Sequence, residues 1–429
     1  MSEIAKMTLV CPDCFGEAGL QRRIKEIRPD FSDEACDFHP SKKGIPVSAV
    51  AEIVDQVFRN SYTFGNYHPQ YDEFMGNDLP GTLYDLTEAD DHRVVTALAD
   101  ALVDGDDYWP PDGEDAFYSD EASYVENDAG YEEHSHTWRF FRRDILHEQR
   151  FFSERALGKL NEIFDGLHLL RDEADSPAVY LLEPNSEGSE IYRARKANSF
   201  GAREEIVGDP ANKLGPPPEK LRRAGRMNPS GILAFYGAFD LETCVAELRP
   251  AVGETVISAK FVLTRPILVL DTTKFSGRPK AINIFAPTYV TRMRLWKFMT
   301  TFMNEIARPC LPDDEHLDYV PTQVVSEYLT HLHKFKRGDK EMTIDAVIYR
   351  SAQNGNGKNI AIFGDAANVE GAGSNSRFAS QLDKSGLKMV EGSLASYEVS
   401  GVSHTAHEVY TPDPKNEAQY RDEDEGFPF

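Results

Sequence analysis

The chain has 429 residues, of which 41% are hydrophobic and 11% aromatic, so it is long and apolar enough for two or three domains with cores. Its formal net charge is −25, and so acidic a chain is repelled by nucleic-acid phosphates and anionic membrane surfaces. It shows no apolar run of about eighteen residues and no charged-then-apolar leader. Its five cysteines do not form a disulfide framework. We therefore expect a cytoplasmic protein, without a membrane role, for which nucleic acid is an unlikely partner.

Three cysteines and a histidine near the N-terminus form the first candidate site. Cys11 and Cys14 are spaced C-x-x-C, and Cys36 and His39 repeat this spacing about twenty residues later. Four such ligands surround zinc tetrahedrally and leave no position open, so the pattern predicts a structural zinc site. The alternative is a set of unligated thiols with His39 on the surface. A redox-active pair is disfavoured because no βαβ pattern surrounds it.

Apolar residues recur at helical spacing after this pattern. The clearest series follows i, i+3, i+4, i+7 and i+8, typical of a helix with one buried face, and consists of Val50, Ile53, Val54, Val57 and Phe58. A second helix is expected over Glu88–Leu102 with Thr87 as its N-cap, and a third from Thr137 to Leu170. We assign residues 1–45 to a zinc-knuckle segment and 46–172 to a helical domain.

An acidic and aromatic stretch interrupts the helices. No Lys or Arg occurs between Arg93 and Arg139, while Asp and Glu crowd Asp100–Glu133 alongside Tyr108, Trp109, Phe117, Tyr118, Tyr124 and Tyr131. One interpretation is an exposed acidic loop whose aromatic side chains fold back onto the helices; the other is a partner-binding surface. Calcium would require a spaced ligand loop that is not seen.

Arg142 and His147 stand in an R-x4-H arrangement within the third predicted helix. This resembles the catalytic motif of HEPN ribonucleases, in which arginine and histidine perform acid–base chemistry on RNA. On a regular helix, however, the two side chains would lie about 140° apart, so a dimer or a local irregularity would have to align them. A ribonuclease therefore remains an alternative function.

Residues 173–402 combine β-rich and helical segments, which makes the whole chain an α+β protein. Expected strands are Ala178–Leu182, Ile191–Arg195, Ile232–Ala238, Thr255–Val262, Pro266–Asp271, Asp345–Ser351 and Asn359–Gly364, and expected helices are Asp240–Leu248, Tyr289–Ala307 and Thr322–His331. Asn198–Pro218 is expected to be a long loop able to cover a cleft. Gly355–Gly357 is expected in a hairpin, and residues 403–429 form an acidic, disordered tail.

The stretch Arg222–Pro250 brings the most chemistry together. It reads as a basic turn, an aromatic strand and a helix that carries a carboxylate, which would direct Arg226, Tyr236 and Glu247 toward one cleft. These three side chains suit an anionic substrate with a cationic reacting centre.

The motif G-R-M-N-P-S-G-I-x-x-F-Y-G-A-x-D-x-E-T-x-x-A-E-L-R-P in this stretch resembles the RES domain, as do I-Y-R-A-R at Ile191–Arg195 and L-G-P-P-P at Leu214–Pro218. The resemblance covers about Val179–Phe363. It implies a mixed α/β fold similar to that of ADP-ribosyltransferases and a toxin-like enzyme that consumes NAD. Residues 1–172 resemble the HEPN-like region that precedes a RES domain in some proteins, which begin with similar knuckles.

The resemblance also implies the site residues, which are Arg193, Arg226, Tyr236, Glu247 and Ser351. Nicotinamide leaves NAD as a neutral molecule, so the reaction needs one carboxylate where ordinary glycosidases need two. Glu247 would hold the ribose hydroxyls and stabilise the oxocarbenium-like charge. The two arginines would bind the pyrophosphate, Tyr236 would stack on nicotinamide or ribose, and Ser351 would hydrogen-bond the amide or a ribose hydroxyl.

We therefore expect an NAD glycohydrolase or phosphorylase acting as a bacterial toxin or defence effector, with NAD as substrate and zinc as a structural metal. The alternatives are an ADP-ribosyltransferase acting on a macromolecule and a non-catalytic interaction protein in which Glu247 simply pairs with Arg249. An antitoxin or regulatory protein is an expected partner, and a homo-oligomer is also considered.

Overall fold

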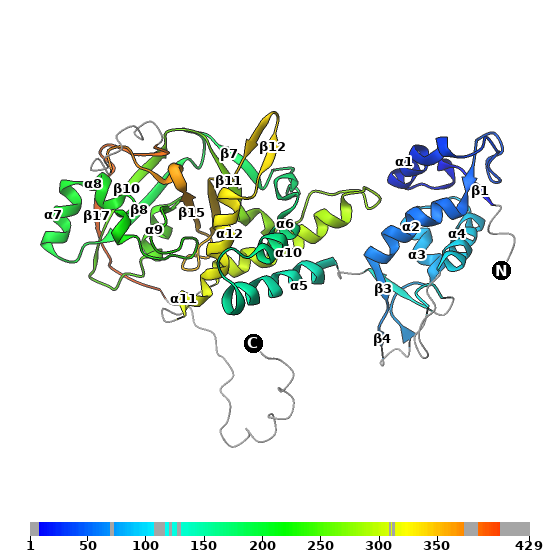
Figure 1. The fold of residues 1–429 in the computed structure, drawn as a ribbon, viewed down its shortest axis with the longest axis horizontal. Helices are drawn as coiled ribbons and strands as arrows, with labels where there is room; N and C mark the ends of the chain where they lie inside the picture. The colour runs from blue at the N-terminus through cyan, green and yellow to red at the C-terminus, as the bar shows by residue number, and fades with distance from the viewer. Residues whose placement is uncertain are drawn as a thin grey trace, which may run out of the picture.

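The computed structural model of the chain describes residues 8–68, 73–106, 116–119, 122–126, 130–308, 310, 314–372 and 385–403. The predicted acidic tail therefore lies outside the described residues except for residue 403. Helices surround a large mixed sheet in the C-terminal part, which fits the expected α+β class (Figure 1).

The N-terminal part contains four helices and short strand pairs among its described residues. The helices are α1 (Ala18–Ile27), α2 (Val47–Ser61), α3 (Leu79–Thr87) and α4 (His92–Gly105), and the strands are β1 (Leu9–Val10), β2 (Ile45–Pro46), β3 (Tyr62–Phe64), β4 (Tyr67–His68), β5 (Glu73–Phe74) and β6 (Tyr124–Glu126). The strand pairs are β1–β2, β3–β6 and β4–β5. The apolar stripe predicted from Val50 to Phe58 is confirmed, because all five residues of the stripe are buried in helix α2.

The predicted start of the second helix is wrong. Thr87 ends α3, where its buried hydroxyl donates to the Leu83 carbonyl. Helix α4 begins five residues later, at His92, after Asp91, whose carboxylate accepts from the backbone N–H of Arg93. Asp is as good an N-cap as Thr, and here it is the residue that precedes the buried apolar series.

The aromatic residues of the acidic stretch that are described fold back onto α2. Tyr118 and Tyr124 are buried and make edge contacts with Phe58, and the guanidinium of Arg59 lies over the rings of Phe117 and Tyr118. These contacts support the first interpretation of the stretch. Tyr108, Trp109 and the Tyr131 side chain lie outside the described part of the structure.

The C-terminal part is organised around a nine-stranded sheet. The strand order is β16-β10-β8-β9-β15-β14-β11-β7, with β17 also paired to β10. The strands are β7 (Val179–Leu182), β8 (Glu190–Lys196), β9 (Ala234–Ala238), β10 (Thr255–Leu263), β11 (Ile267–Asp271), β14 (Ala346–Arg350), β15 (Lys358–Phe363), β16 (Leu387–Met389) and β17 (Ala395–Glu398). Every described pairing is antiparallel except β11–β14. All seven predicted strands exist, with bounds that lie within two residues of the predicted ones.

Helices pack on the sheet through a core rich in aromatic residues. The helices involved are α5 (Gly130–Arg143), α6 (Glu154–Phe164), α10 (Tyr289–Ala307) and α12 (Val320–His331) (Figure 1). Trp138 stacks on Phe141 and meets Phe298 and Phe302 of α10 edge-on. Residues 138–170 thus join the core of the sheet, whereas the sequence analysis grouped them with the N-terminal helices.

The predicted single helix from Thr137 to Leu170 is wrong. Helix α5 runs into a π-helical turn at Asp144–Glu148, and α6 starts afresh after Ser153, whose hydroxyl accepts from the Ala156 N–H. Between them Phe152 adopts a positive φ of 56°, which no helical residue has. The apolar series continues through the break, so periodicity alone does not reveal it.

The predicted loop over Asn198–Pro218 is also wrong, because it contains two short helices. Helix α7 (Phe200–Gly208) is capped by Ser199, and α8 (Pro210–Leu214) begins with a proline, which is favoured at a first helical position. Ile206 and Leu214 are buried and anchor them to the second face of the sheet.

A segment preceding α10 contacts the N-terminal part. Phe285 is buried in the core of α1–α4, and the Asn283 side-chain amide donates to Glu17 Oε1 at 2.5 Å. Gly19 faces Asn283 so closely that a Cβ would fall 1.8 Å from its side-chain oxygen. The two parts of the chain are thus joined by specific contacts as well as by sequence.

Candidate functional site

Glu247 is positioned at the end of a short helix that follows a central strand. Helix α9 (Leu241–Glu247) starts at Asp240, whose carboxylate accepts from both the N–H and the hydroxyl of Thr243. Asp240 comes two residues after β9 ends, so this cap fixes the helix directly to the sheet. The expected strand–turn–helix is confirmed.

Two side chains from the β14–β15 hairpin orient the Glu247 carboxylate. Its Oε1 accepts hydrogen bonds from Ser351 Oγ at 2.5 Å and from Asn359 Nδ2 at 2.7 Å. Ser351 and Asn359 are buried, whereas Glu247 is exposed to a cavity. Ser351 Oγ also accepts from the backbone N–H groups of Gln353 and Asn354, which aims its own proton at the carboxylate.

Close packing holds this hairpin against α9. Asn354 Nδ2 donates to Thr243 Oγ1 at 2.9 Å, and Gly357 approaches Thr243 so closely that a Cβ would lie 2.1 Å from the same oxygen. Only glycine permits this approach. The predicted hairpin therefore exists, and its tip is part of the site.

The main cavity beside Glu247 has a volume of about 730 Å³, within the usual range for ligand sites. Arg193 and Arg195 both line it, because alternate residues of β8 face the same side of the sheet. Among the described residues, no carboxylate pairs with either guanidinium. Arg193 donates to the Tyr236 carbonyl and lies over the Phe235 ring, while Arg195 Nε is buried without a hydrogen-bond partner.

The electrostatics of this wall favour an anion. Burial, with the neighbouring Arg195 charge, lowers the pKa of Arg193 to about 9, so that its guanidinium stays protonated at neutral pH. Burial also lowers the pKa of Arg195. Two half-buried cations without counter-ions among the described residues are costly, and an anionic ligand would offset that cost.

Arg226 lies in a second, adjoining cavity of about 330 Å³, which Glu247 also lines. Its guanidinium donates to the Arg308 carbonyl at 2.8 Å and lies over the Tyr319 ring. The predicted residues Arg193 and Arg226 therefore stand in separate hollows, with the Glu247 carboxylate between them.

Tyr236 holds the basic turn in place. Its hydroxyl donates to Asn228 Oδ1 at 2.7 Å and accepts from the Met227 N–H at 3.0 Å, and burial raises its pKa. A Cβ added to Gly225 would lie 2.8 Å from this hydroxyl, so the turn needs a glycine at this position. The ring lines the main cavity, while the hydroxyl is already used by the protein.

The structure thus places the other four predicted residues in the cavities or hydrogen bonds around the Glu247 carboxylate. It adds Arg195 and Asn359, which the sequence analysis missed. The alternation of β8 could have identified Arg195, but no local pattern identifies Asn359, which reaches Glu247 only through strand pairing. No ion pair joins Glu247 to Arg249 among the described residues, so the pairing considered as an alternative is not seen.

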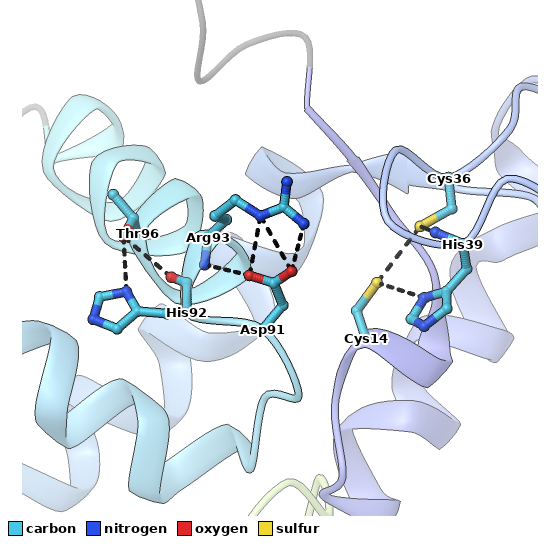
Figure 2. Close-up of polar contacts among 7 residues, drawn as sticks. All are labelled: Cys14, Cys36, His39, Asp91, His92, Arg93 and Thr96. Atoms are coloured by element: carbon cyan, nitrogen blue, oxygen red, sulfur yellow. Dashed lines mark hydrogen bonds and ion pairs between the residues drawn. The ribbon is translucent and has the colours of Figure 1, made fainter.

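The four predicted metal ligands also come together. The ligand atoms of Cys11, Cys14, Cys36 and His39 all lie within 4.8 Å of one another. Figure 2 shows Cys14 facing both Cys36 and His39, at Sγ–Sγ and Sγ–Nδ1 distances of 3.5 and 3.4 Å. Zinc bonds of about 2.0–2.3 Å imply tetrahedral edges of about 3.5–3.8 Å, so these residues fit zinc.

Neighbouring elements support this cluster. Arg93, at the start of α4, lies over the ring of Phe38, which sits between the two ligands of the second knuckle. All three cysteines are buried in the N-terminal core. Since three cysteines and a histidine supply the four ligands that structural zinc takes, the site has the composition of a structural metal site.

Arg142 and His147 do not form a site together. Arg142 makes an ion pair with Glu305 at 2.9 Å, whereas His147 is exposed in the π-helical turn. No contact links the two side chains in the described part of the chain. The irregularity of the helix does not bring them together.

Comparison with known families identifies one region. Residues 190–379 match the family model of the RES domain, which supports the RES family for this part of the chain and covers all five candidate site residues. RES domains are generally associated with NAD-related toxin function. Searches of curated proteins and of solved structures found no match. Within the described residues, the helices are too short or too polar to cross a membrane.

Proposed function

We propose that the cavity around Glu247 binds NAD and that the enzyme cleaves its nicotinamide–ribose bond. The observation that carries this proposal is the Glu247 carboxylate, which Ser351 and Asn359 orient through one oxygen while cavities lined by arginine lie to either side. The proposal makes the chain an NAD-acting enzyme with one catalytic carboxylate.

Glu247 stabilises the charge that develops as the bond breaks. The bond electrons move onto the nicotinamide nitrogen, which becomes neutral, and the ribose acquires oxocarbenium character. A fixed carboxylate close to that centre stabilises the transition state more than the ground state. Ser351 and Asn359 act as positioning residues, because a carboxylate held before the reaction needs no reorganisation during it.

Arginines bind the rest of the substrate. Arg193 and Arg195, which share the main cavity, hold the pyrophosphate, and Arg226 in the adjoining cavity provides a further cation for the substrate. Each charge-assisted hydrogen bond contributes about 1.5–3 kcal/mol. The ring of Tyr236 stacks on nicotinamide or ribose. These cations also reverse locally the repulsion that the net charge of −25 exerts on an anion.

The acceptor decides the product. Attack by water gives ADP-ribose, and attack by inorganic phosphate gives ADP-ribose 1″-phosphate. Transfer to a macromolecule is the second candidate function. Glu247 is exposed in its cavity, which leaves room for a large acceptor. We further propose an ADP-ribosyltransferase-like fold for the RES part, structural zinc at the N-terminal cluster, and a toxin role restrained by a neutralising protein.

The test is the concentration of NAD over time with purified protein, with and without phosphate, and with products identified by mass. Glu247→Gln should lower turnover by about 10²–10³-fold, as loss of a charge stabiliser does. The control is Glu242→Gln, which removes the same charge from an exposed position of the same helix. Equal loss of NAD in wild type and Glu247→Gln, or intact NAD in every buffer with folded protein, would contradict the proposal.

A further inference from the structure

Another large cavity, of about 710 Å³, adjoins the proposed NAD site, with which it shares Ser351 and Arg350. Three elements form it: helix α5, helix α10, and the β14–β15 hairpin through Ser351 and Gly355. It does not include Glu247, Arg193 or Tyr236.

Helical spacing explains why α5 presents one continuous wall. Ser135, Trp138, Arg139 and Arg142 line the cavity at positions i, i+3, i+4 and i+7, which share one helix face. The facing residues of α10 include Phe298, Phe302 and Glu305, which follow the same spacing. The wall is aromatic at its base, where Trp138 meets the rings of Phe298 and Phe302 edge-on.

The charge of this cavity is strongly positive. Arg139, Arg142, Arg308 and Arg350 line it, and Glu305 is the one carboxylate among its described lining residues. Glu305 is already engaged, because its oxygens bind Arg142 Nη1 at 2.9 Å and Trp138 Nε1 at 2.7 Å.

The other guanidinium groups of the cavity make no ion pair in the described part of the chain. Within the described residues, Arg139, Arg308 and Arg350 pair with no carboxylate, and Arg142 Nε is buried without a hydrogen-bond partner. In a chain of net charge −25, free acidic groups are abundant, so a group of unpaired arginines points to an external anion.

We propose that this cavity binds an organic phosphate, with its phosphate on the arginines of α5 and on Arg308, which follows α10, and its flat ring on the aromatic wall at Trp138. Arginine forks match phosphate oxygens in pairs, and an aromatic wall favours a planar ring over a sugar. The ligand class is therefore a nucleoside monophosphate or a similar aromatic phosphate.

A ligand in this cavity would affect the orientation of the catalytic carboxylate. Ser351 lines the cavity and donates to Glu247 at 2.5 Å, and Arg350 lines both this cavity and the one that contains Arg226. A ligand here contacts the hairpin that orients Glu247, so it is positioned to change turnover without occupying the NAD site. This regulatory consequence rests on the proposed function, whereas binding does not.

The test uses AMP as the probe and calorimetry on the full chain at constant ionic strength. Wild type should bind AMP more tightly than inorganic phosphate, because the ring adds contacts. Arg139→Gln should weaken AMP binding about tenfold or more, the effect expected for one charge-assisted hydrogen bond. Arg143→Gln is the matched control: it removes the same charge from an exposed residue of the same helix that does not line the cavity.

Four outcomes would overturn the binding proposal. They are no saturable binding of AMP, equal weakening in Arg139→Gln and Arg143→Gln, inorganic phosphate binding as tightly as AMP, and AMP binding that is lost in Arg193→Gln but kept in Arg139→Gln. The last outcome would place AMP in the Glu247 cavity. Competition between NAD and AMP in Glu247→Gln, which leaves NAD uncleaved, would make the cavity part of the NAD site and likewise overturn the proposal.

The regulatory consequence has its own readout. AMP should change the rate of NAD loss in wild type and in Arg143→Gln, but not in Arg139→Gln at the same concentration. An unchanged rate in wild type saturated with AMP would remove the regulation and leave the binding site. If no variant consumes NAD at all, the proposed function fails, while calorimetry still decides the binding proposal.

Discussion

Ser351 Oγ donates a 2.5 Å hydrogen bond to Oε1 of Glu247, across 104 residues of sequence. Because two backbone N–H groups donate to the same hydroxyl, its proton has one direction, toward the carboxylate. The Ser351→Ala variant should therefore lower kcat for NAD about 10–100-fold with a smaller change in KM, since one hydrogen bond to a charged group is lost.

Steady-state kinetics of NAD consumption checks this prediction, with Ser230→Ala as the control. Ser230 is exposed, does not line the cavity, and donates its hydroxyl to the Arg222 carbonyl. A variant with normal kcat would show that Asn359 alone orients the carboxylate.

Arg193 should contribute mainly to substrate binding. Arg193→Gln keeps the side chain's length and removes its charge, so kcat/KM for NAD should fall about 10–100-fold, with most of the change in KM. Arg278→Gln, an exposed arginine that does not line the cavity, makes the same charge change. Similar kinetics for the two variants would remove Arg193 from the site.

The N-terminal cluster should hold about one zinc per chain. Cys36→Ser should lower zinc content measured by elemental analysis and lower the thermal unfolding midpoint, because the ligands are part of the N-terminal core. Cys310 is a buried cysteine elsewhere in the chain, so the Cys310→Ser variant should contain as much zinc as wild type. The assignment would be contradicted if wild type contained no zinc after purification and added zinc did not change its unfolding midpoint.

His333 should make the protein less stable in mild acid. Burial, with the nearby charge of His168, lowers the pKa of His333 to about 4, below the ordinary value of 6.5. Between pH about 6.5 and 4 the unfolded chain therefore binds a proton at His333 that the folded chain does not, so the free energy of unfolding falls as pH is lowered through this window, by up to about 3 kcal/mol.

Denaturant unfolding at several pH values tests this titration. His333→Gln removes the group and should reduce the loss of stability over the window, after allowing for the lost contact with the Tyr328 hydroxyl. Parallel pH profiles for wild type and His333→Gln would show that other groups cause the acid sensitivity.

Residue spacing in the sequence predicted those features that depend only on residues close together in the chain. The i, i+3, i+4 stripe of α2 follows from the burial of one helix face, and the predicted bounds of α10 agree with the structure at both ends. The C-x-x-C and C-x-x-H spacings identified four metal ligands, because short knuckles hold ligands at nearly fixed distances. The order of the RES motifs pointed to the region that the family model matches.

Tertiary structure alone decided how these pieces meet. Asn359 reaches Glu247 because β15 pairs with β9, and strand register is set by pairing between distant segments. The break after α5 and the helices within Asn198–Pro218 depend on caps and on burial against the sheet, which periodicity does not register. The cavity between α5 and α10 exists only because the two helices face each other, so its unpaired arginines become a group only in the folded chain.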